Sequence, residues 1–395
     1  MKRLICIILC LCLAMAAGGC ARDPIIPETT AFTPTEEVTV PPPVDPYIPE
    51  PIHGIALPTL SETTQAEDGT LLFTKTYQKF QLILNDRDIN DIISADLQSR
   101  LSVAMYDATD IETTARTAYD PQKAWNPYLM EVSYTPTRID RAVLSLFGNH
   151  LTYRGSVHPT LVTESINYDL STGSSLTLGD ILADGTNGAA VCELIIQALA
   201  PRAEKDLYGD HQEVLRDRFH QNYKGLTDWY FSRTGLCFHF SPYDIAPYSS
   251  GTIVAEIPYE KLAGVIQDKY LPSSRVVPTG SMYAETYMED DGERFMFIAN
   301  VELDPKGTKI LLHPDAPITD VRIESGNWSS DGTLYVPSST IFAADYIDLG
   351  NAIVLTAGFS ETDPVLRLVY RSGDLEVSAI IDYDAAGDSI QLTHG

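Results

Sequence analysis

The side chains best suited to chemistry or binding lie in the stretch FHFSPYDIAPYSSG, residues 238–251. Tyr243 and Tyr248 each follow a proline, and Asp244 lies beside the first of them. A tyrosine combines a large apolar face with a polar tip, which suits it to an interface or to pinning a loop against its own sheet. Because the prolines stiffen the loop, little chain entropy remains to be lost on binding. The loop is therefore a candidate binding surface, with a self-packed turn as the alternative.

A histidine offers a second candidate in the stretch YRGSVHP, residues 153–159. His158 lies between a turn and a proline, where its ring either faces a partner or forms hydrogen bonds that hold the turn. The candidate ligand-binding residues are therefore His158, Tyr243, Asp244 and Tyr248.

Catalytic and metal-binding motifs are missing from the sequence. It contains no GxSxG, SxxK, HExxH or GxxxxGK segment, and its eight histidines include no pair at i, i+4. The acidic run YMEDDGER, residues 287–294, lacks the alternating order of a calcium loop and indicates a solvated hairpin. We predict no catalytic residue, metal or cofactor. The enzyme alternative is a glycan-modifying activity built from dispersed carboxylates or from His158.

The N-terminus indicates export. Lys2 and Arg3 precede a short apolar run, and small residues lead to Cys20, an arrangement that resembles the lipobox of bacterial lipoproteins. We predict a signal peptide over residues 1–19, with Cys20 as the site of lipid attachment. This predicts a protein anchored by its lipid at the extracytoplasmic face of the bacterial cell membrane. An ordinary secretory cleavage that leaves Cys20 as a thiol is the alternative.

Composition predicts a tether after the signal and excludes some partners. Residues 20–70 contain ten prolines before Leu60 and few large apolar side chains, so we predict an extended tether. The formal charge is −27, and it becomes −29 when the two basic residues of the signal are removed. Such a chain does not bind nucleic acid by charge, whereas cationic proteins are attracted to it. A simpler explanation of the same negative charge is that it keeps the protein soluble.

The remaining chain divides by its hydrophobic pattern. Residues 71–275 mix helical stripes with alternating runs, which predicts an α+β domain in which helices pack on an antiparallel sheet. Residues 276–395 contain seven or so short apolar runs separated by turn residues, which predicts a β-sandwich. We place the boundary within the stretch YLPSSRVVPTG, residues 270–280.

Several elements of the first domain are specific predictions. Ile89, Ile92, Ile93, Leu97 and Leu101 predict a helix that lies on a sheet. Thr177 and Asp180 stand at capping-box spacing at the start of a short helix, which Gly185 is placed to end. Two further helices cover residues 191–199 and 210–219, and Leu236, Phe238 and Phe240 share one strand face. Cys192 and Cys237 are predicted to be small buried side chains, and a disulfide between them is the alternative.

Two stretches resemble a known family. The segment LTYRGSVHPTLVTESINYDLSTGSSLTLGDIL and the segment GLCFHFSPYDIAPYSSGTIVAEIPYEKL are similar to the RsiV-like extracellular domain, which also precedes the catalytic domain of PdaC-type peptidoglycan deacetylases. The resemblance covers residues 73–270, and the second segment is the more specific. Ser156 and Val157 depart from the Gly and Ala of the family, and Ser174 stands where Lys is frequent. The matching positions are Gly155, His158, Asp169, Leu170, Thr172, Gly173, Pro242, Tyr243, Ala246, Pro247, Tyr248 and Gly251.

The resemblance implies an α+β domain at the outer cell surface, and one branch of the family, the anti-sigma factors, recognises lysozyme. In this sequence we expect neither a cytoplasmic sigma-binding part nor the deacetylase catalytic domain. We therefore expect a surface lipoprotein that binds or senses a ligand of the cell wall. The expected ligand is a cationic muralytic protein such as lysozyme, or peptidoglycan. A structural lipoprotein of envelope assembly remains a third reading.

Overall fold

The computed structural model of the chain describes residues 47–221, 223–272, 279–360, 362–384, 387 and 389–394. The predicted signal over residues 1–19, the lipid-attachment residue Cys20 and the tether as far as residue 46 lie outside the described residues. From Ile48 onward the chain forms one compact unit.

The second half of the predicted tether is wrong, because the chain is already folded there. Strands β1 (Gly54–Ala56) and β2 (Thr59–Gln65) lie within residues 20–70, and Ile52, Ile55 and Leu57 are buried. The prolines of this segment flank the short apolar run GIAL and do not interrupt it. Prolines are tolerated at strand ends, so the composition of the segment did not exclude short strands.

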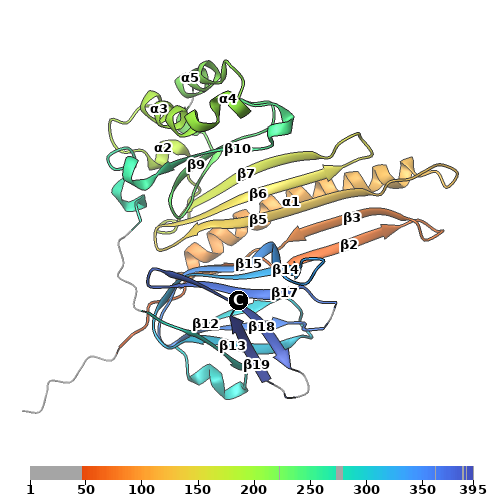
Figure 1. The fold of residues 1–395 in the computed structure, drawn as a ribbon, viewed down its shortest axis with the longest axis vertical. Helices are drawn as coiled ribbons and strands as arrows, with labels where there is room; N and C mark the ends of the chain where they lie inside the picture. The colour runs from red at the N-terminus through yellow and green to blue at the C-terminus, as the bar shows by residue number, and fades with distance from the viewer. Residues whose placement is uncertain are drawn as a thin grey trace, which may run out of the picture. The chain divides into compact units, whose positions relative to one another are not determined.

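A five-stranded sheet and one long helix form the first layer pair. The strand order is β2-β3-β5-β6-β7, in which β3 and β5 are parallel and the other pairs are antiparallel. Helix α1 (Arg87–Ala118) packs along this sheet (Figure 1). The additional strands are β3 (Leu71–Gln78), β5 (Tyr128–Ile139), β6 (Val143–Tyr153) and β7 (Thr160–Asp169).

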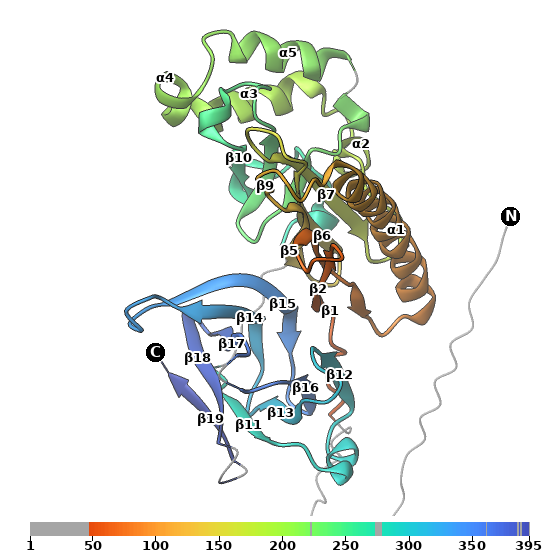
Figure 2. The same cartoon turned by 90° about the vertical axis from the view of Figure 1, so that its right-hand side faces the viewer.

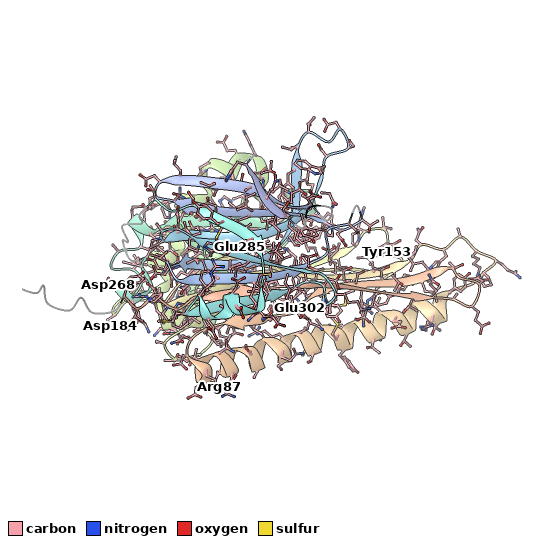
Figure 3. All side chains as sticks on the ribbon, turned by 90° about the horizontal axis from the view of Figure 1, so that it is seen from below. Arg87, Tyr153, Asp184, Asp268, Glu285 and Glu302 are labelled. Atoms are coloured by element: carbon pink, nitrogen blue, oxygen red, sulfur yellow. The ribbon has the colours of Figure 1, made fainter. Side chains whose placement is uncertain are left out.

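Helix α1 is longer than the apolar stripe that predicted it. Asp86 caps it by accepting a hydrogen bond from the backbone N–H of Ile89 at 3.1 Å. Beyond Leu101 the buried face continues through three alanines and one isoleucine, and the 32 residues of the helix span about 48 Å. In Figure 3, Arg87 marks the start of the helix and Tyr153 the end of β6. The buried residues are Ile93, Leu97, Leu101, Ala104, Ala108, Ile111 and Ala115.

A three-stranded sheet, in the order β10-β9-β8, lies beneath a group of helices (Figure 1). The middle strand is buried on both faces: Phe238 faces the helices, whereas His239 bonds to Thr163 of β7 at 3.1 Å between Nδ1 and Oγ1. The elements are α2 (Leu178–Ile181), α3 (Gly188–Leu199), α4 (Ala203–Asp206), α5 (His211–Gln221), β8 (Trp229–Phe231), β9 (Gly235–Phe240) and β10 (Ile253–Pro258).

The local predictions for these helices are confirmed with one change of length. Asp180 accepts a hydrogen bond from the backbone N–H of Thr177 at 2.8 Å, which is the bond that the N3 side chain makes in a capping box, and it accepts a second one from the Thr177 hydroxyl at 2.6 Å. The helix ends at Ile181 and not near Gly185, because Leu182 turns extended and pairs with Ile266. Leu215 and Phe219 of α5 are buried in the same core.

The C-terminal strands form a two-sheet sandwich, as predicted (Figure 2). The sheet orders are β11-β13-β16-β12 and β19-β18-β17-β14-β15-β1-β4. Strand β1 and strand β4 (Gln81–Ile83) complete the second sheet, so residues before the predicted boundary at 275 contribute to it. The other strands are β11 (Met282–Thr286), β12 (Phe297–Glu302), β13 (Thr308–Pro314), β14 (Ile318–Trp328), β15 (Tyr335–Ile347), β16 (Asn351–Ala357), β17 (Val365–Ser372), β18 (Leu375–Asp384) and β19 (Ser389–His394).

Candidate functional site

The loop between β9 and β10 is held rigidly from below. Ile245 and Ala246 are buried in the core of the helices and the three-stranded sheet. The backbone N–H of Tyr243 donates to the carbonyl of Ala246 at 2.9 Å. The carboxylate of Asp244 accepts from the backbone N–H of Ser241 at 3.0 Å. These contacts fix the backbone of the turn while its two tyrosines project outward.

Tyr243 has a backbone conformation that is unfavourable for a non-glycine residue. Its φ of 76° lies in the left-handed region, which costs a non-glycine residue roughly 1–2 kcal/mol. Its side chain is 67% exposed, so burial of the ring returns little of that cost. An exposed aromatic residue held in a strained conformation is the kind of outlier that marks a functional position.

Tyr248 connects the loop to the β6–β7 turn. It begins the short 3-10 helix η3 (Tyr248–Ser250), and Pro247 precedes it. Its ring lies 5.8 Å from that of Tyr243 between centroids and 5.9 Å from that of His158. Its hydroxyl donates to the carbonyl of Pro159 at 3.4 Å. Three aromatic rings from two distant segments therefore form one exposed group, which we call the aromatic cluster.

The β6–β7 turn presents His158 through its backbone. Gly155 has a φ of 75°, and a Cβ atom there would lie 3.0 Å from the Tyr128 ring. The hydroxyl of Ser156 donates to the carbonyl of His158 at 2.6 Å and closes the turn. The backbone carbonyl of His158 thus closes the turn, whereas its imidazole packs beside Tyr248. The adjacent Val157 is 90% exposed.

Asp244 has a supporting position in this site. One guanidinium nitrogen of Arg218 lies 3.7 Å from its carboxylate, and Arg218 also pairs with Asp228. Together with the bond to Ser241, this pairing directs the carboxylate toward its own loop. Of the four predicted residues, three come together as the aromatic cluster and Asp244 holds the turn beneath it.

Sequence reasoning missed a neighbouring segment. The backbone N–H of Tyr208 donates to the carbonyl of Ile245 at 2.9 Å, and the Ser250 hydroxyl donates to the carbonyl of Asp206 at 3.1 Å. These bonds join the turn after α4 to the aromatic loop, and Tyr208 is partly exposed there. The sequence feature that could have pointed to this segment is the tyrosine between acidic residues in DLYGD, residues 206–210.

A polar network lies apart from the cluster, between α1 and the five-stranded sheet. Glu164 accepts hydrogen bonds from the hydroxyl of Tyr134 at 2.7 Å and pairs with the imidazole of His150 at 2.8 Å. Burial raises the pKa of Tyr134, while His150 and Tyr134 hold the pKa of Glu164 below its usual value against the opposing effect of burial. These groups satisfy one another across β5, β6 and β7, and Arg100 of α1 lies 3.6 Å from the other carboxylate oxygen of Glu164, so the network also links the helix to the sheet.

Cys192 and Cys237 are free, buried thiols and do not form a disulfide. Burial is the main cause that raises the pKa of each thiol to about 11. Over the described residues, no group of three or more His, Cys, Asp or Glu side chains is arranged to hold a metal ion. None of the helices in the described part of the chain has the length and apolar character needed to cross a membrane.

One part of the chain is similar to a known protein family. Residues 179–260 match the family model DUF3298, described as "Protein of unknown function (DUF3298)". The matched segment begins within α2 and ends two residues beyond β10. This range includes Tyr243, Asp244 and Tyr248 and excludes His158. No curated protein matches the chain.

Two solved structures of DUF3298 proteins are similar to the chain. A member of the family from Bacteroides fragilis NCTC 9343 is 17% identical with a TM-score of 0.42, and the match covers 55% of this chain and 94% of that chain. A DUF3298 family protein from Pseudomonas aeruginosa PAO1 is also 17% identical, with a TM-score of 0.39 and coverage of 57% and 99%. The finer resemblance to the RsiV-like domain stays a prediction.

Proposed function

We propose that the protein is a cell-surface binding module that captures a cationic, wall-degrading protein of the lysozyme type through its aromatic cluster. The observation that carries the proposal is the meeting of His158, Tyr243 and Tyr248 on one exposed surface, with Tyr243 held at a φ of 76°. Tyrosine rings on a rigid backbone are effective anchors because few side-chain torsions are lost when they are buried.

Charge favours a cationic partner. The chain carries a formal charge of −27, and Asp206 and Asp210 lie in the segment that is bonded to the aromatic loop. A negative field of this size attracts positively charged proteins and raises their association rate, and the effect weakens as salt screens it. The negative charge of the protein gives no comparable attraction for peptidoglycan, the other expected ligand.

The location belongs to the same proposal. A lipid on Cys20 would hold the protein at the extracytoplasmic face of the membrane, where it meets wall-degrading enzymes before they reach the lipid bilayer. Labelling of growing cells with a palmitate analogue tests the anchor: the wild type takes up label and Cys20→Ala does not. Equal labelling of both would contradict attachment at Cys20.

The binding experiment measures the affinity of the purified protein for lysozyme by biolayer interferometry at low and high salt. We expect saturable binding that weakens with salt, and a loss of at least about tenfold when Tyr243 and Tyr248 are both replaced by Ala. Tyr106→Ala is the matched control, because Tyr106 is a tyrosine of α1 that is 78% exposed and remote in sequence from the cluster.

Two further arms separate capture of a wall-degrading protein from other binding. Cytochrome c, which is cationic but does not degrade walls, should bind more weakly than lysozyme, since charge alone does not supply a contact for the rings. Sedimentation with insoluble peptidoglycan should leave the protein in solution. Cosedimentation without affinity for lysozyme would overturn the proposal and indicate that the ligand is the glycan. Equal binding of lysozyme and cytochrome c would show that binding depends on charge alone and not on the aromatic cluster.

A further inference from the structure

A cleft of about 540 Å³ lies at the opposite end of β9 from the aromatic cluster. Its walls come from the end of β5, the turn between β8 and β9, and strands β14, β15, β17 and β18 of the sandwich. The volume falls within the range of small-molecule sites in proteins. The two ends of β9, a six-residue strand, are separated by roughly 17 Å, so the cleft is distinct from the aromatic cluster.

Arg233 lines the cleft from a turn whose backbone is fixed. The backbone N–H groups of Thr234 and Gly235 donate to the hydroxyl of Ser232 at 3.1 Å and 2.9 Å. The hydroxyl of Tyr259 donates to the backbone carbonyl of the same serine at 2.8 Å. These bonds hold the turn from both sides, so the position from which the Arg233 side chain extends is well defined.

The guanidinium of Arg233 is only partly satisfied by the protein. Its Nε lies 3.4 Å from the carboxylate of Asp320, longer than the distance of about 2.7–2.9 Å that is typical of a charge-assisted hydrogen bond. Within the part of the chain that the structure describes, Arg233 donates no side-chain hydrogen bond, although a guanidinium carries several N–H donors. Burial lowers the pKa of Arg233, and the charge of Arg322 lowers it further against the opposing effect of Asp320. A second anion would supply the acceptors that Asp320 alone does not.

Asp320 is placed beside Arg233 by an irregularity of its strand. The register of β14 against β17 shifts between Thr319 and Arg322, and Asp320 has a φ of 52°. Among the described residues, Asp320 and Tyr243 are the two non-glycine residues with positive φ. A bulge with a strained residue beside a cavity is a recurring feature of functional sites.

Arg371 brings a second guanidinium to the cleft. It lies on β17, opposite Thr319 of β14. Over the residues that the structure describes, Arg371 has no ion-pair partner and donates no side-chain hydrogen bond. Burial is the main cause of the lowered pKa of Arg233, and the charge of Arg371 adds to it, so the two guanidinium groups lie close enough to repel each other. An anion that contacts both groups would replace this repulsion by two attractions.

The carboxylates of the lining already interact with other groups of the protein. Most of them are accompanied by an arginine, and the remaining one also has a partner within the chain. They therefore leave Arg371 as a positive charge that no carboxylate of the lining balances. The pairs are Asp140 with Arg138, Asp320 with Arg233 and Glu376 with Arg322, and the remaining carboxylate is that of Asp345.

We propose that this cleft binds an anionic ligand through a carboxylate or phosphate group that is held by Arg233 and Arg371. Both groups share their charge over several oxygens and match the fork of N–H donors that a guanidinium presents. A volume of about 540 Å³ is many times the roughly 30 Å³ that one water molecule occupies, so the anionic group can belong to a larger molecule. The proposal does not depend on the function assigned to the aromatic cluster.

The test is isothermal titration calorimetry of the purified protein with inorganic phosphate and with 3-phenylpropionate, in chloride buffer at constant ionic strength. We expect at least one of the two anions to bind saturably. Stronger binding of phosphate would identify a phosphate group as the ligand feature, and stronger binding of 3-phenylpropionate would identify a carboxylate on an organic body. Failure of both anions to bind saturably would overturn the proposal.

An uncharged analogue separates recognition of the anion from burial of the phenyl ring. If 3-phenylpropionate binds, 3-phenylpropionamide should bind at least about tenfold more weakly, because it lacks the charge that the two arginines recognise. Equal affinity for the acid and the amide, without binding of phosphate, would also overturn the proposal.

Variants locate the site. Arg371→Gln and Arg233→Gln should each lower the affinity for the bound anion about tenfold. Arg87→Gln is the matched control, since Arg87 lies on α1 and its side chain is 92% exposed. Arg371 is exposed and unpaired among the described residues, so its replacement leaves the fold intact, and unchanged affinity in Arg371→Gln would contradict the proposal. The variant with Tyr243 and Tyr248 replaced by Ala should bind the anion like the wild type.

Discussion

The ring of His158 lies 5.9 Å from the ring of Tyr248, although the two residues belong to turns of different hairpins. His158 is carried by the β6–β7 turn of the five-stranded sheet and Tyr248 by the β9–β10 loop of the three-stranded sheet. The hydroxyl of Tyr248 also donates to the carbonyl of Pro159. Two sheets thus jointly define the position of one exposed surface.

The first prediction concerns the strain at Tyr243. Tyr243→Gly relieves a left-handed conformation that costs roughly 1–2 kcal/mol, at an entropic cost of about 0.5–1 kcal/mol for glycine. We expect the free energy of unfolding in urea to stay the same or to rise by up to about 1.5 kcal/mol. Affinity for lysozyme should fall in the same variant. A loss of stability with unchanged affinity would assign Tyr243 to the fold.

The close approach of β9 and β10 at Gly235 predicts that a substitution there lowers the stability of the fold. A Cβ atom there would lie 2.2 Å from the carbonyl oxygen of Ile257, so Gly235→Ala must push β10 away from β9. We expect a loss of about 1–3 kcal/mol in thermal or urea unfolding. At Gly209 an added Cβ atom meets nothing within 4 Å, and Gly209→Ala is the control. Equal stability of the two variants would show that the strands are not so closely packed.

Asp169 predicts a dependence of stability on acid. It accepts hydrogen bonds from Lys269 at 2.9 Å and from Tyr270 at 3.0 Å, and with Ser171 these contacts lower its pKa from 3.8 to about 2 against burial. Because the folded pKa is the lower one, the stabilisation is present above about pH 4 and is lost as pH falls toward 2. Asp169→Asn should cost about 1–2 kcal/mol at pH 7, after allowance for the exposure of Lys269.

The measurement is urea unfolding of the wild type and of Asp169→Asn between pH 7 and pH 2. The difference between the two proteins should be constant at neutral pH and shrink below about pH 4. Asp107→Asn, at an exposed position of α1, serves as the control. A difference that grew on acidification would contradict the assignment.

The buried thiols predict slow chemistry in the folded protein. Cys192 and Cys237 have pKa values of about 11, and the thiolate is the reactive form, so iodoacetamide at pH 7.5 should label neither in the native state. Both should react rapidly in urea, as counted by mass spectrometry. Fast labelling of either residue without denaturant would show that its side chain is reached through local opening.

Local chemistry explains what could be predicted from the sequence. The capping box of Thr177 and Asp180 and the inward face of Leu215 and Phe219 depend on neighbours a few residues apart, and both predictions are confirmed. The prolines before Tyr243 and Tyr248 correctly indicated an ordered loop. Such features carry their structural signal within one short segment.

Features that depend on distant partners were not predictable in the same way. β1 is three residues long, and it is folded because β15 pairs with it from nearly the other end of the chain. The continuation of α1 beyond Leu101 was hidden because alanines maintain its buried face. The cleft combines Arg233 with Asp320 and Arg371, and no periodicity of the sequence connects these residues.

If the aromatic cluster is the contact surface for a cationic partner, hydrogen–deuterium exchange with and without lysozyme should reveal it. We expect lysozyme to slow exchange in the segments 155–160 and 241–251 and to leave α1 unchanged. The tip of the β14–β15 hairpin exposes Trp328 and Leu334 and is the competing surface in the sandwich. Protection at that tip, with none at the two predicted segments, would contradict the claim.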